Sequence, residues 1–374
     1  MDRSLILTSN QGHPSCPLDL NASGPLDLNA SGQVNPLDLK PCGLANLGNT
    51  CFLNSCIQVL VSISELHKIP PPNTKPDEAD TKLFTEFHSL AKMLSAAPPN
   101  SIISPNRFVY STQEFARQKR REIFTGWAQN DITEFLLFII ECMHNSISRS
   151  VKVNLKGTPG NTQDDLAVQC FSMVKEHYSK DYSEIMDLCF GVYVSRILSV
   201  DETITHSLKP EFFFILDLPI PPQSKNPKIH LYDCFDEFIK TEHLYGENAW
   251  MNETTKQLED IHKHILFWSF PDILVIALKR FSADGQAKNG VFVDFPIQSL
   301  DLSKYVSGYN ANSYVYNLVG VCNHMGGVMG GHYTAFSTRD NVNWWHFNDT
   351  QVDLVSPAQI ISPMAYCLFY RKTK

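Results

Sequence analysis

The sequence predicts an α+β protein, because helical patterns dominate its first half and strand patterns its second half. Between residues 51 and 145, apolar side chains recur every three or four positions, which is the spacing of amphipathic helices. After about residue 185, short runs rich in β-branched and aromatic residues are separated by turn residues, as in strands. The composition, with 43% hydrophobic and 19% charged residues, is that of a globular protein. Helices first and strands later favour the α+β class.

The first 40 residues differ in composition from the rest of the chain. PLDLNASG occurs at 17–24 and again at 25–32, and a third PLDL follows at 36–39. Such repeats cannot bury a core, so we expect residues 1–40 to form a disordered tail. PLDL also resembles the docking motif that C-terminal-binding protein co-repressors read, although Asn or Lys replaces the usual following Ser. Three copies would raise avidity through effective concentration.

Residues 41–374 are expected to be globular, with helices before strands. Helices are predicted over Cys51–Leu66, 81–94 and Asp131–Asn145, the last being the most amphipathic. A Pro-rich loop is predicted at 70–80 and a polar surface loop at 148–166. Strands are predicted at 190–199, 211–218, 273–279, 314–321, 332–338, 342–347 and 364–371.

Charge and apolar run lengths exclude several classes of protein. With 31 Lys and Arg against 39 Asp and Glu, the net charge of −8 argues against a nucleic-acid partner. No apolar run approaches the ~20 residues that span a bilayer, and the N-terminus lacks a signal-peptide core, so no membrane partner is expected. We expect an intracellular protein, cytoplasmic or nuclear, with reduced thiols. None of the ten cysteines forms a CxxC pair, which argues against a zinc ribbon or a redox pair.

The first chemical signal is the segment from Gly43 to Ser55, in which a Gly- and Asn-containing turn precedes a helix. Cys51 falls in the first helical turn, where free N–H groups and the helix dipole are expected to stabilise a thiolate. Asn46 lies five residues earlier, and its amide N–H₂ can point into the same space. That is the arrangement an oxyanion donor needs.

The second signal lies almost 300 residues later, where His332 follows a glycine-rich loop at the start of a predicted strand. A later strand ends at Asn348 and Asp349, and one of these can accept a hydrogen bond from the histidine and fix its tautomer. A cysteine nucleophile, a histidine base and an Asn or Asp that orients the base make a complete cysteine-protease set.

These segments resemble the ubiquitin-specific protease family. Residues 43–60 are similar to its cysteine box and 317–349 to its histidine box. Gln129–Leu136 resembles the helix start Gln-Gln-Asp-x-x-Glu-Phe-Leu, and Pro271–Phe281 resembles the strand P-x-x-L-x-I-x-L-K-R-F. The resemblance covers about 42–372, nearly the whole globular chain.

This resemblance implies a papain-like fold with three subdomains. They would be a thumb at about 42–188, fingers at about 189–270 and a palm at about 271–372. The implied reaction is cofactor-free hydrolysis of the isopeptide or peptide bond after the C-terminal glycine of ubiquitin. Cys51 would be the nucleophile, His332 the base and Asn348 the residue that orients it. Asn46 and Asp349 would assist the oxyanion and its water.

The resemblance also implies a binding site for the C-terminal tail of ubiquitin. Its residues would be Gln129, Asp131, Glu134, His324, Gly330, Gly331 and Tyr333. Asp131 and Glu134 also fit a capping box, with Asp131 as N-cap and Glu134 at N3, and the two interpretations are partly compatible. His324 either lines the cleft for the tail or caps the loop.

The clearest departure from the family is in the fingers, where many relatives hold zinc through two CxxC pairs. The corresponding stretches 198–205 and 248–256 contain no cysteine, and Cys234, His243, His262 and His264 do not recreate the ligand spacing of a tetrahedral site, so no metal is expected. Side-chain packing of Trp250, Phe267 and Trp268 would then hold the fingers together. Two alternatives to a deubiquitinase stay open: a ubiquitin-binding scaffold without strong catalysis, and a protease for another ubiquitin-like modifier.

Overall fold

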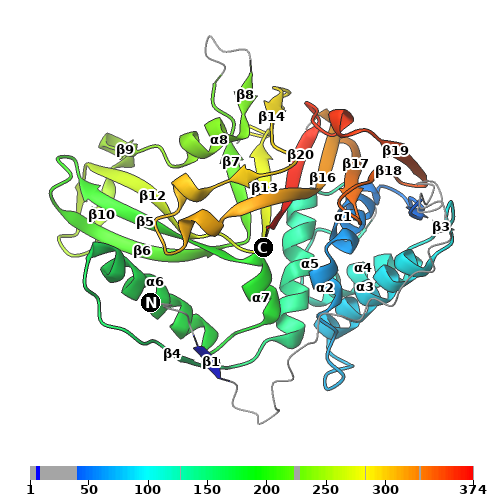
Figure 1. The fold of residues 1–374 in the computed structure, drawn as a ribbon, viewed down its shortest axis with the longest axis horizontal. Coiled ribbons are helices and arrows are strands. Elements are labelled where there is room, and N and C mark those ends of the chain that lie inside the picture. Colours follow the sequence, from blue (N-terminus) through cyan, green and yellow to red (C-terminus); the bar gives the residue numbers. More distant parts are fainter. Residues whose placement is uncertain are drawn as a thin grey trace, which may run out of the picture.

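Helices and strands gather into three groups in a computed structural model of the chain (Figure 1). The structure describes the backbone of residues 6–8, and residues 40–126, 128–222, 228–282, 284–327 and 330–373. The PLDL repeats therefore lie outside the described residues. A helical group occupies one side of the view in Figure 1, a long sheet the middle and a second sheet the other side.

The helical group corresponds to the predicted thumb. It contains α1 (Cys51–Ser62), α2 (Ser64–His67), α3 (Ala79–Ala96), α4 (Asn106–Gln118), α5 (Ile132–Ile147) and α7 (Glu184–Cys189). The predicted helix from Cys51 to Leu66 is divided in two, because the buried Ile63 is extended, with φ −90° and ψ 90°. The helices predicted at 81–94 and 131–145 are present and slightly longer.

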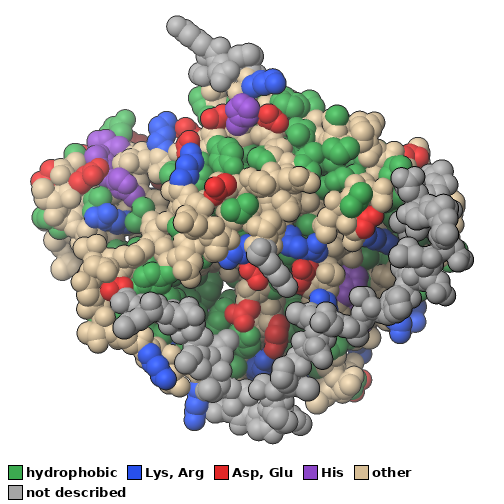
Figure 2. All heavy atoms as spheres, in the orientation of Figure 1, with side chains coloured by type: hydrophobic (Ala, Val, Ile, Leu, Met, Phe, Trp, Pro, Cys, Tyr) green, Lys and Arg blue, Asp and Glu red, His purple; other side chains and the backbone are tan. Residues whose placement is uncertain are grey.

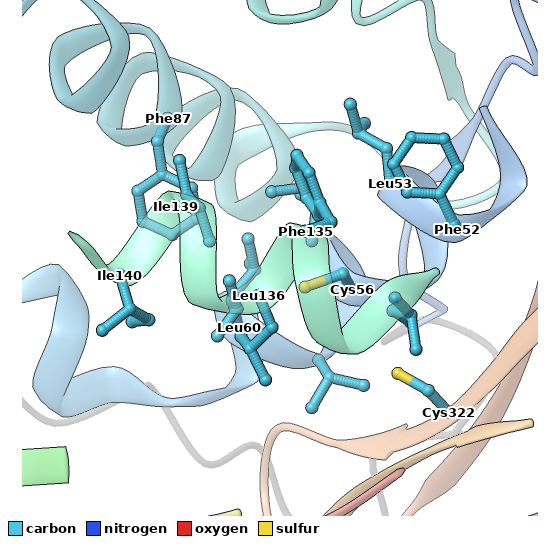
Figure 3. Packing of buried hydrophobic residues seen from close by; sticks show 14 of the residues in the cluster. Phe52, Leu53, Cys56, Leu60, Phe87, Phe135, Leu136, Ile139, Ile140 and Cys322 are labelled. Carbon is cyan, nitrogen blue, oxygen red and sulfur yellow. The ribbon is translucent and has the colours of Figure 1, made fainter. Parts of the chain in front are cut away.

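The thumb core forms where α1 meets α5. Both helices carry apolar side chains on their facing surfaces, and α3 and the long sheet close the core (Figure 3). The side chains labelled there are Phe52, Leu53, Cys56 and Leu60 of α1, Phe135, Leu136, Ile139 and Ile140 of α5, Phe87 and Cys322. Since α1 also packs along β17, the helix that begins at Cys51 is fixed against the strand that carries His332.

The long sheet corresponds to the predicted palm and has the order β19-β18-β17-β16-β20-β13-β7. Its strands are β7 (Ile215–Pro219), β13 (Ile273–Lys279), β16 (Val315–Gly327), β17 (Gly330–Thr338), β18 (Trp344–Asn348), β19 (Gln351–Val355) and β20 (Ala365–Lys372), with β15 (Leu300–Asp301) beside β16. The glycine-rich segment expected as a loop is instead the paired end of the β16–β17 hairpin, with Gly327 opposite Gly330.

The second sheet corresponds to the predicted fingers. It has the order β6-β5-β12-β9, and α6 packs against β6. Its elements are β5 (Gly191–Ser199), β6 (Thr205–Phe213), β9 (Glu242–Leu244), β12 (Ile261–Ser269) and α6 (Thr162–Tyr178). Phe267 and Trp268 are buried, as expected for packed fingers, whereas Trp250 is half-buried and lies near His206.

Short elements connect the three groups. They are β2 (Gly43–Leu44) paired with β3 (Ile102–Ile103), β8 (Ile229–His230) paired with β14 (Val293–Asp294), β10 (Trp250–Asn252) paired with β11 (Gln257–Glu259), and α8 (Leu231–Phe238). Single 3₁₀ turns occur at Gly246–Asn248, Ser303–Tyr305, Ala311–Ser313 and Pro357–Gln359. Among the described residues, no helix is long and apolar enough to cross a membrane.

Three predictions differ from this arrangement. The loop at 148–166 contains β4 (Lys152–Asn154) and the start of α6, because alternate residues Val151 and Val153 are buried. β4 pairs with β1 (Ile6–Thr8), which lies within the tail predicted to be disordered. The strand expected at 211–218 is two strands, β6 and β7. β7 joins the palm sheet although its sequence position is within the range assigned to the fingers.

Candidate active site

Cys51 is the first residue of α1, and a hydrogen-bonded turn fixes its position. Asn46 Oδ1 accepts hydrogen bonds from the backbone N–H groups of Gly48, at 3.0 Å, and Thr50, at 3.2 Å. Leu47 N–H donates to Thr50 Oγ1 over 2.9 Å. Thr50, the N-cap, gives no side-chain bond to the helix, so it leaves the first N–H groups of α1 free beside the thiol.

The pKa of the Cys51 thiol is raised, although N–H groups at the helix start were expected to stabilise the thiolate. Burial is the largest cause, and the Asp349 carboxylate raises the pKa further. The backbone N–H groups of Tyr333, Phe52 and Cys51 lower it, as predicted, but do not outweigh burial. The N–H groups therefore stabilise the thiolate as predicted, but burial and Asp349 outweigh them, so the pKa of the thiol is raised in the free protein.

His332 is oriented by Asn348. The two side chains meet because β17 and β18 are antiparallel neighbours, and His332 Nε2–H donates to Asn348 Oδ1 over 2.7 Å. This bond places the proton on Nε2 and leaves the Nδ1 lone pair available to act as a base. Within the described ranges, Cys51 and His332 form no hydrogen bond with each other.

Asp349 connects the turn after β18 to the turn before α1. Among the described contacts, it forms no hydrogen bond with His332. Its Oδ2 accepts from Asn46 Nδ2 over 2.9 Å, and its Oδ1 accepts from Asn54 Nδ2 over 2.8 Å. Its backbone O accepts from Leu44 N–H over 2.9 Å. One of the two Nδ2 hydrogens of Asn46 is therefore donated to Asp349, so the amide does not point freely into the site.

Sequence reasoning did not select Asn54, which is 2% exposed and anchors Asp349 from within α1. A signal was available, because Asn54 lies between apolar residues in a helix expected to be buried, and a buried amide must find hydrogen-bond partners.

All seven residues predicted to bind a peptide tail line a single open groove. They are Gln129, Asp131, Glu134, His324, Gly330, Gly331 and Tyr333, and Phe281 and Tyr366 line it with them. The groove leads toward the thiol, because the backbone N–H of Tyr333 also interacts with Cys51. The two aromatic residues Phe281 and Tyr366 were not predicted, since each looks like an ordinary core position in its strand.

The two acidic residues of the groove differ in what they already bind. Asp131 Oδ1 accepts from Thr133 N–H over 2.7 Å, which caps α5, and its Oδ2 accepts from Tyr366 Oη over 2.8 Å and Tyr333 Oη over 3.4 Å. Glu134 is exposed, and burial and the neighbouring Asp131 raise its pKa. The reciprocal bond of a capping box, from Asp131 N–H to Glu134, is not among the described contacts.

His324 is 4% exposed and packs between the rings of Phe281, Tyr333 and Tyr366. Burial lowers its pKa to about 4, so the ring is neutral at physiological pH. It packs so closely on Gly331 that any Cβ at that position would clash with the His324 ring. His324 therefore forms a neutral wall of the groove. Since Asp131 already accepts hydrogen bonds from Thr133 and Tyr366, Glu134 is the carboxylate of the groove that is available to a ligand.

Gln129 spans the groove to the backbone beside His332. Its Nε2 donates to Gly331 O over 2.9 Å, and its Oε1 accepts from Gly331 N–H over 2.8 Å. These are the two backbone groups that an extended peptide would use for strand pairing.

Comparisons with known proteins identify the relatives of this chain. A sequence model of the ubiquitin carboxyl-terminal hydrolase family matches residues 42–370. Ubiquitin carboxyl-terminal hydrolase 2 of Bos taurus is 33% identical over 341 residues, which are 88% of this chain and 54% of that protein. The protein of the same name from Gallus gallus is 34% identical over 340 residues, 88% of this chain and 92% of that protein. This chain thus spans about half the length of the bovine protein.

A solved structure shares the fold. The chain matches, with a TM-score of 0.64, a structure described as the SAGA Ubp8/Sgf11/Sus1/Sgf73 DUB module bound to ubiquitin aldehyde. The match has 23% sequence identity and covers 89% of this chain and 70% of the other.

Proposed function

The chain belongs to the ubiquitin carboxyl-terminal hydrolase family as a ubiquitin-specific protease, and we propose that it is a thiol-dependent deubiquitinase. It would hydrolyse the isopeptide or peptide bond after the C-terminal glycine of ubiquitin. The observation that carries this proposal is the groove lined by Gln129, Glu134 and Gly331, which leads to Cys51 beside the His332–Asn348 pair.

In the proposed reaction, His332 Nδ1 takes the proton of Cys51 Sγ as the sulfur attacks the carbonyl carbon of the terminal glycine. The backbone N–H of Cys51 and the second Nδ2 hydrogen of Asn46 would receive the oxyanion. His332 then gives its proton to the leaving lysine amine. A water, deprotonated by His332, hydrolyses the thioester and regenerates the thiol.

Substrate binding would complete the site. The Cys51 thiol is neutral in the free protein, and Gln129 occupies both backbone groups of Gly331. A tail entering the groove would replace Gln129 on Gly331 and bring the scissile carbonyl to the free N–H groups of α1. The basic side chains of the ubiquitin tail would pair with Glu134, because Asp131 is already saturated by donors.

The test is turnover of a fluorogenic amide on the C-terminus of ubiquitin, in wild type, Cys51→Ala and Cys56→Ala. Cys56 is a matched control because it lies in the same helix but is fully buried in the core. We expect turnover in wild type and Cys56→Ala and none in Cys51→Ala. Absence of wild-type turnover, or equal rates in wild type and Cys51→Ala, would contradict the proposal.

Two rival functions are distinguished by labelling. A ubiquitin probe with a C-terminal electrophile should label Cys51 covalently, whereas a non-catalytic scaffold would bind it without a bond. Equivalent probes built on other ubiquitin-like modifiers should label more slowly, because the acidic Glu134 suits the basic tail of ubiquitin.

We propose two further properties of the chain. An intracellular location, cytoplasmic or nuclear, fits the nine described cysteines, which are all free thiols. Co-repressor docking through the PLDL repeats rests on their sequence, and a pull-down with residues 1–40 and its Leu→Ala variants would test it.

A further inference from the structure

Two histidines and a glutamate meet at the end of the fingers sheet. His262 and His264 point to the same face of β12, because they are two residues apart in a strand. Glu202 reaches them from the turn that joins β5 and β6. Figure 2 shows histidine side chains gathered with acidic ones over the part of the molecule labelled β9 and β10 in Figure 1.

The distances from Glu202 to the two histidines are close to those of a metal site. Glu202 Oε1 lies 3.1 Å from His262 Nδ1 and 3.5 Å from His264 Nε2, and the three ligand atoms all lie within 4.8 Å of one another. Zinc bonds of about 2.0–2.1 Å in a tetrahedron place neighbouring ligand atoms about 3.3 Å apart. An ion could therefore bind all three with little rearrangement of the side chains.

The hydrogen bonding of His264 points to the same role. Its Nε2 is buried and makes no hydrogen bond in the described part of the chain, although Glu202 Oε1 lies 3.5 Å away, and a buried polar atom without a hydrogen bond is costly. Its Nδ1 lies 3.5 Å from Thr241 Oγ1, a contact that orients the ring with Nε2 toward Glu202. Metal-bound histidines are commonly oriented by such a contact at the other ring nitrogen.

The backbone holds Glu202 in place for this role. The turn from Ser199 to Ile204 is closed by Asp201, whose Oδ1 accepts from Ser199 Oγ over 2.6 Å and from Thr203 N–H over 3.2 Å. Glu202 itself has a left-handed backbone, with φ 59°. Its carboxylate is therefore presented by a structured turn.

We propose that Glu202, His262 and His264 form a binding site for a divalent transition-metal ion, with Zn²⁺ as the preferred ion. Imidazole nitrogens and one carboxylate suit Zn²⁺, and three protein ligands leave the fourth position of the tetrahedron for water. Arg196 stands opposite His264 in the β5–β12 register, so the site carries a nearby positive charge. The ion would join the β5–β6 turn to β12 and stabilise the end of the fingers.

The experiment uses the full chain with Cys51→Ala, so that zinc binding to that thiol does not enter the measurement. After dialysis against a chelator, we expect one equivalent of Zn²⁺ to bind and to raise the melting temperature. Co²⁺ in its place should give visible ligand-field bands without the near-ultraviolet band of thiolate ligation. Bound metal is measured by mass spectrometry after gel filtration.

Ligand variants and a matched control decide the assignment. Glu202→Gln and His264→Asn should each weaken Zn²⁺ binding at least tenfold and abolish the shift in melting temperature. His206→Asn should leave both unchanged, because His206 lies in the same region but, among the described residues, its ion-pair partner is Glu259, at 3.8 Å. The proposal fails if the parent binds no stoichiometric zinc, as for a simple ion-pair cluster, or if His264→Asn binds it as well as the parent does.

Discussion

The neutral state of the Cys51 thiol leads to a prediction about its pH dependence. Because burial and Asp349 raise its pKa above that of an ordinary thiol, the thiolate fraction is small at pH 7 and rises about tenfold per pH unit toward pH 9. Alkylation of Cys51 in the free protein by iodoacetamide, followed by mass spectrometry, should show this slope. A rate plateau below pH 8 would instead indicate a preformed thiolate–imidazolium pair.

The bond from His332 to Asn348 leads to a second prediction. Asn348→Ala removes the acceptor of Nε2–H, so the ring loses its fixed tautomer and kcat on the ubiquitin amide should fall by one to two orders of magnitude. Asn348→Asp keeps an acceptor at the same place and should retain most of the activity. Equal loss in both variants would show that the side chain of Asn348 has a role other than orienting the base.

The different partners of Glu134 and Asp131 predict different effects of mutation. Glu134→Gln should raise KM several-fold, because it removes the charge proposed to pair with the basic tail of the substrate. It should change kcat and stability little, since Glu134 is exposed. Asp131→Ala should lower the free energy of unfolding by about 1–2 kcal/mol, because it removes the cap of α5 and leaves the hydroxyl of Tyr366 without its acceptor. Urea denaturation and steady-state kinetics separate these effects.

At the scale of elements, the turn between β18 and β19 holds the start of α1. Asp349→Ala would leave the buried amide of Asn54 without its main acceptor and free Asn46 from its anchor. We expect a loss of about 1–3 kcal/mol in stability, with a fall in kcat larger than the change in KM. Asp353→Ala, at an exposed position of β19 in the same hairpin, is the control and should change neither quantity.

Elements with strong apolar periodicity were predictable from the sequence, and elements whose burial depends on partners were not. The pattern of Ile132, Phe135, Leu136 and Ile139 identified α5, and β13 was predicted with its observed bounds. By contrast, α4 and α6 carry many polar residues and bury a narrow face. Propensity alone cannot indicate such a face until its partner is known.

The proposed active-site residues could be selected from the sequence because each lies in a short segment with a distinctive local sequence. What the sequence could not supply was their mutual geometry. Asp349 contacts Asn46 and Asn54 rather than His332, and the pKa of Cys51 follows from burial, not from its helix position alone. Both depend on how α1 packs against β17.

At the scale of the molecule, residues distant in sequence combine in ways that spacing rules do not detect. Glu202 is 60 residues from His262, and only the β5–β12 pairing brings them together. The expectation of no metal rested on the missing CxxC pairs and on the spacing of Cys234, His243, His262 and His264, neither of which takes Glu202 into account. In the same way, β7 lies between finger strands in sequence but is the edge of the palm sheet.

The distribution of the cores predicts that a chain beginning at Lys40 folds and functions. In the described part of the chain, all three apolar clusters are drawn from Cys42 onward, and β1 contributes a three-residue pairing with β4. The shortened chain should melt within about 2 °C of the full chain, since losing a short edge pairing is worth less than about 1 kcal/mol. Its kcat/KM on the ubiquitin amide should stay within twofold. A larger fall in melting temperature, measured by calorimetry, would mean that the β1–β4 pairing supports the packing of α6 on the fingers.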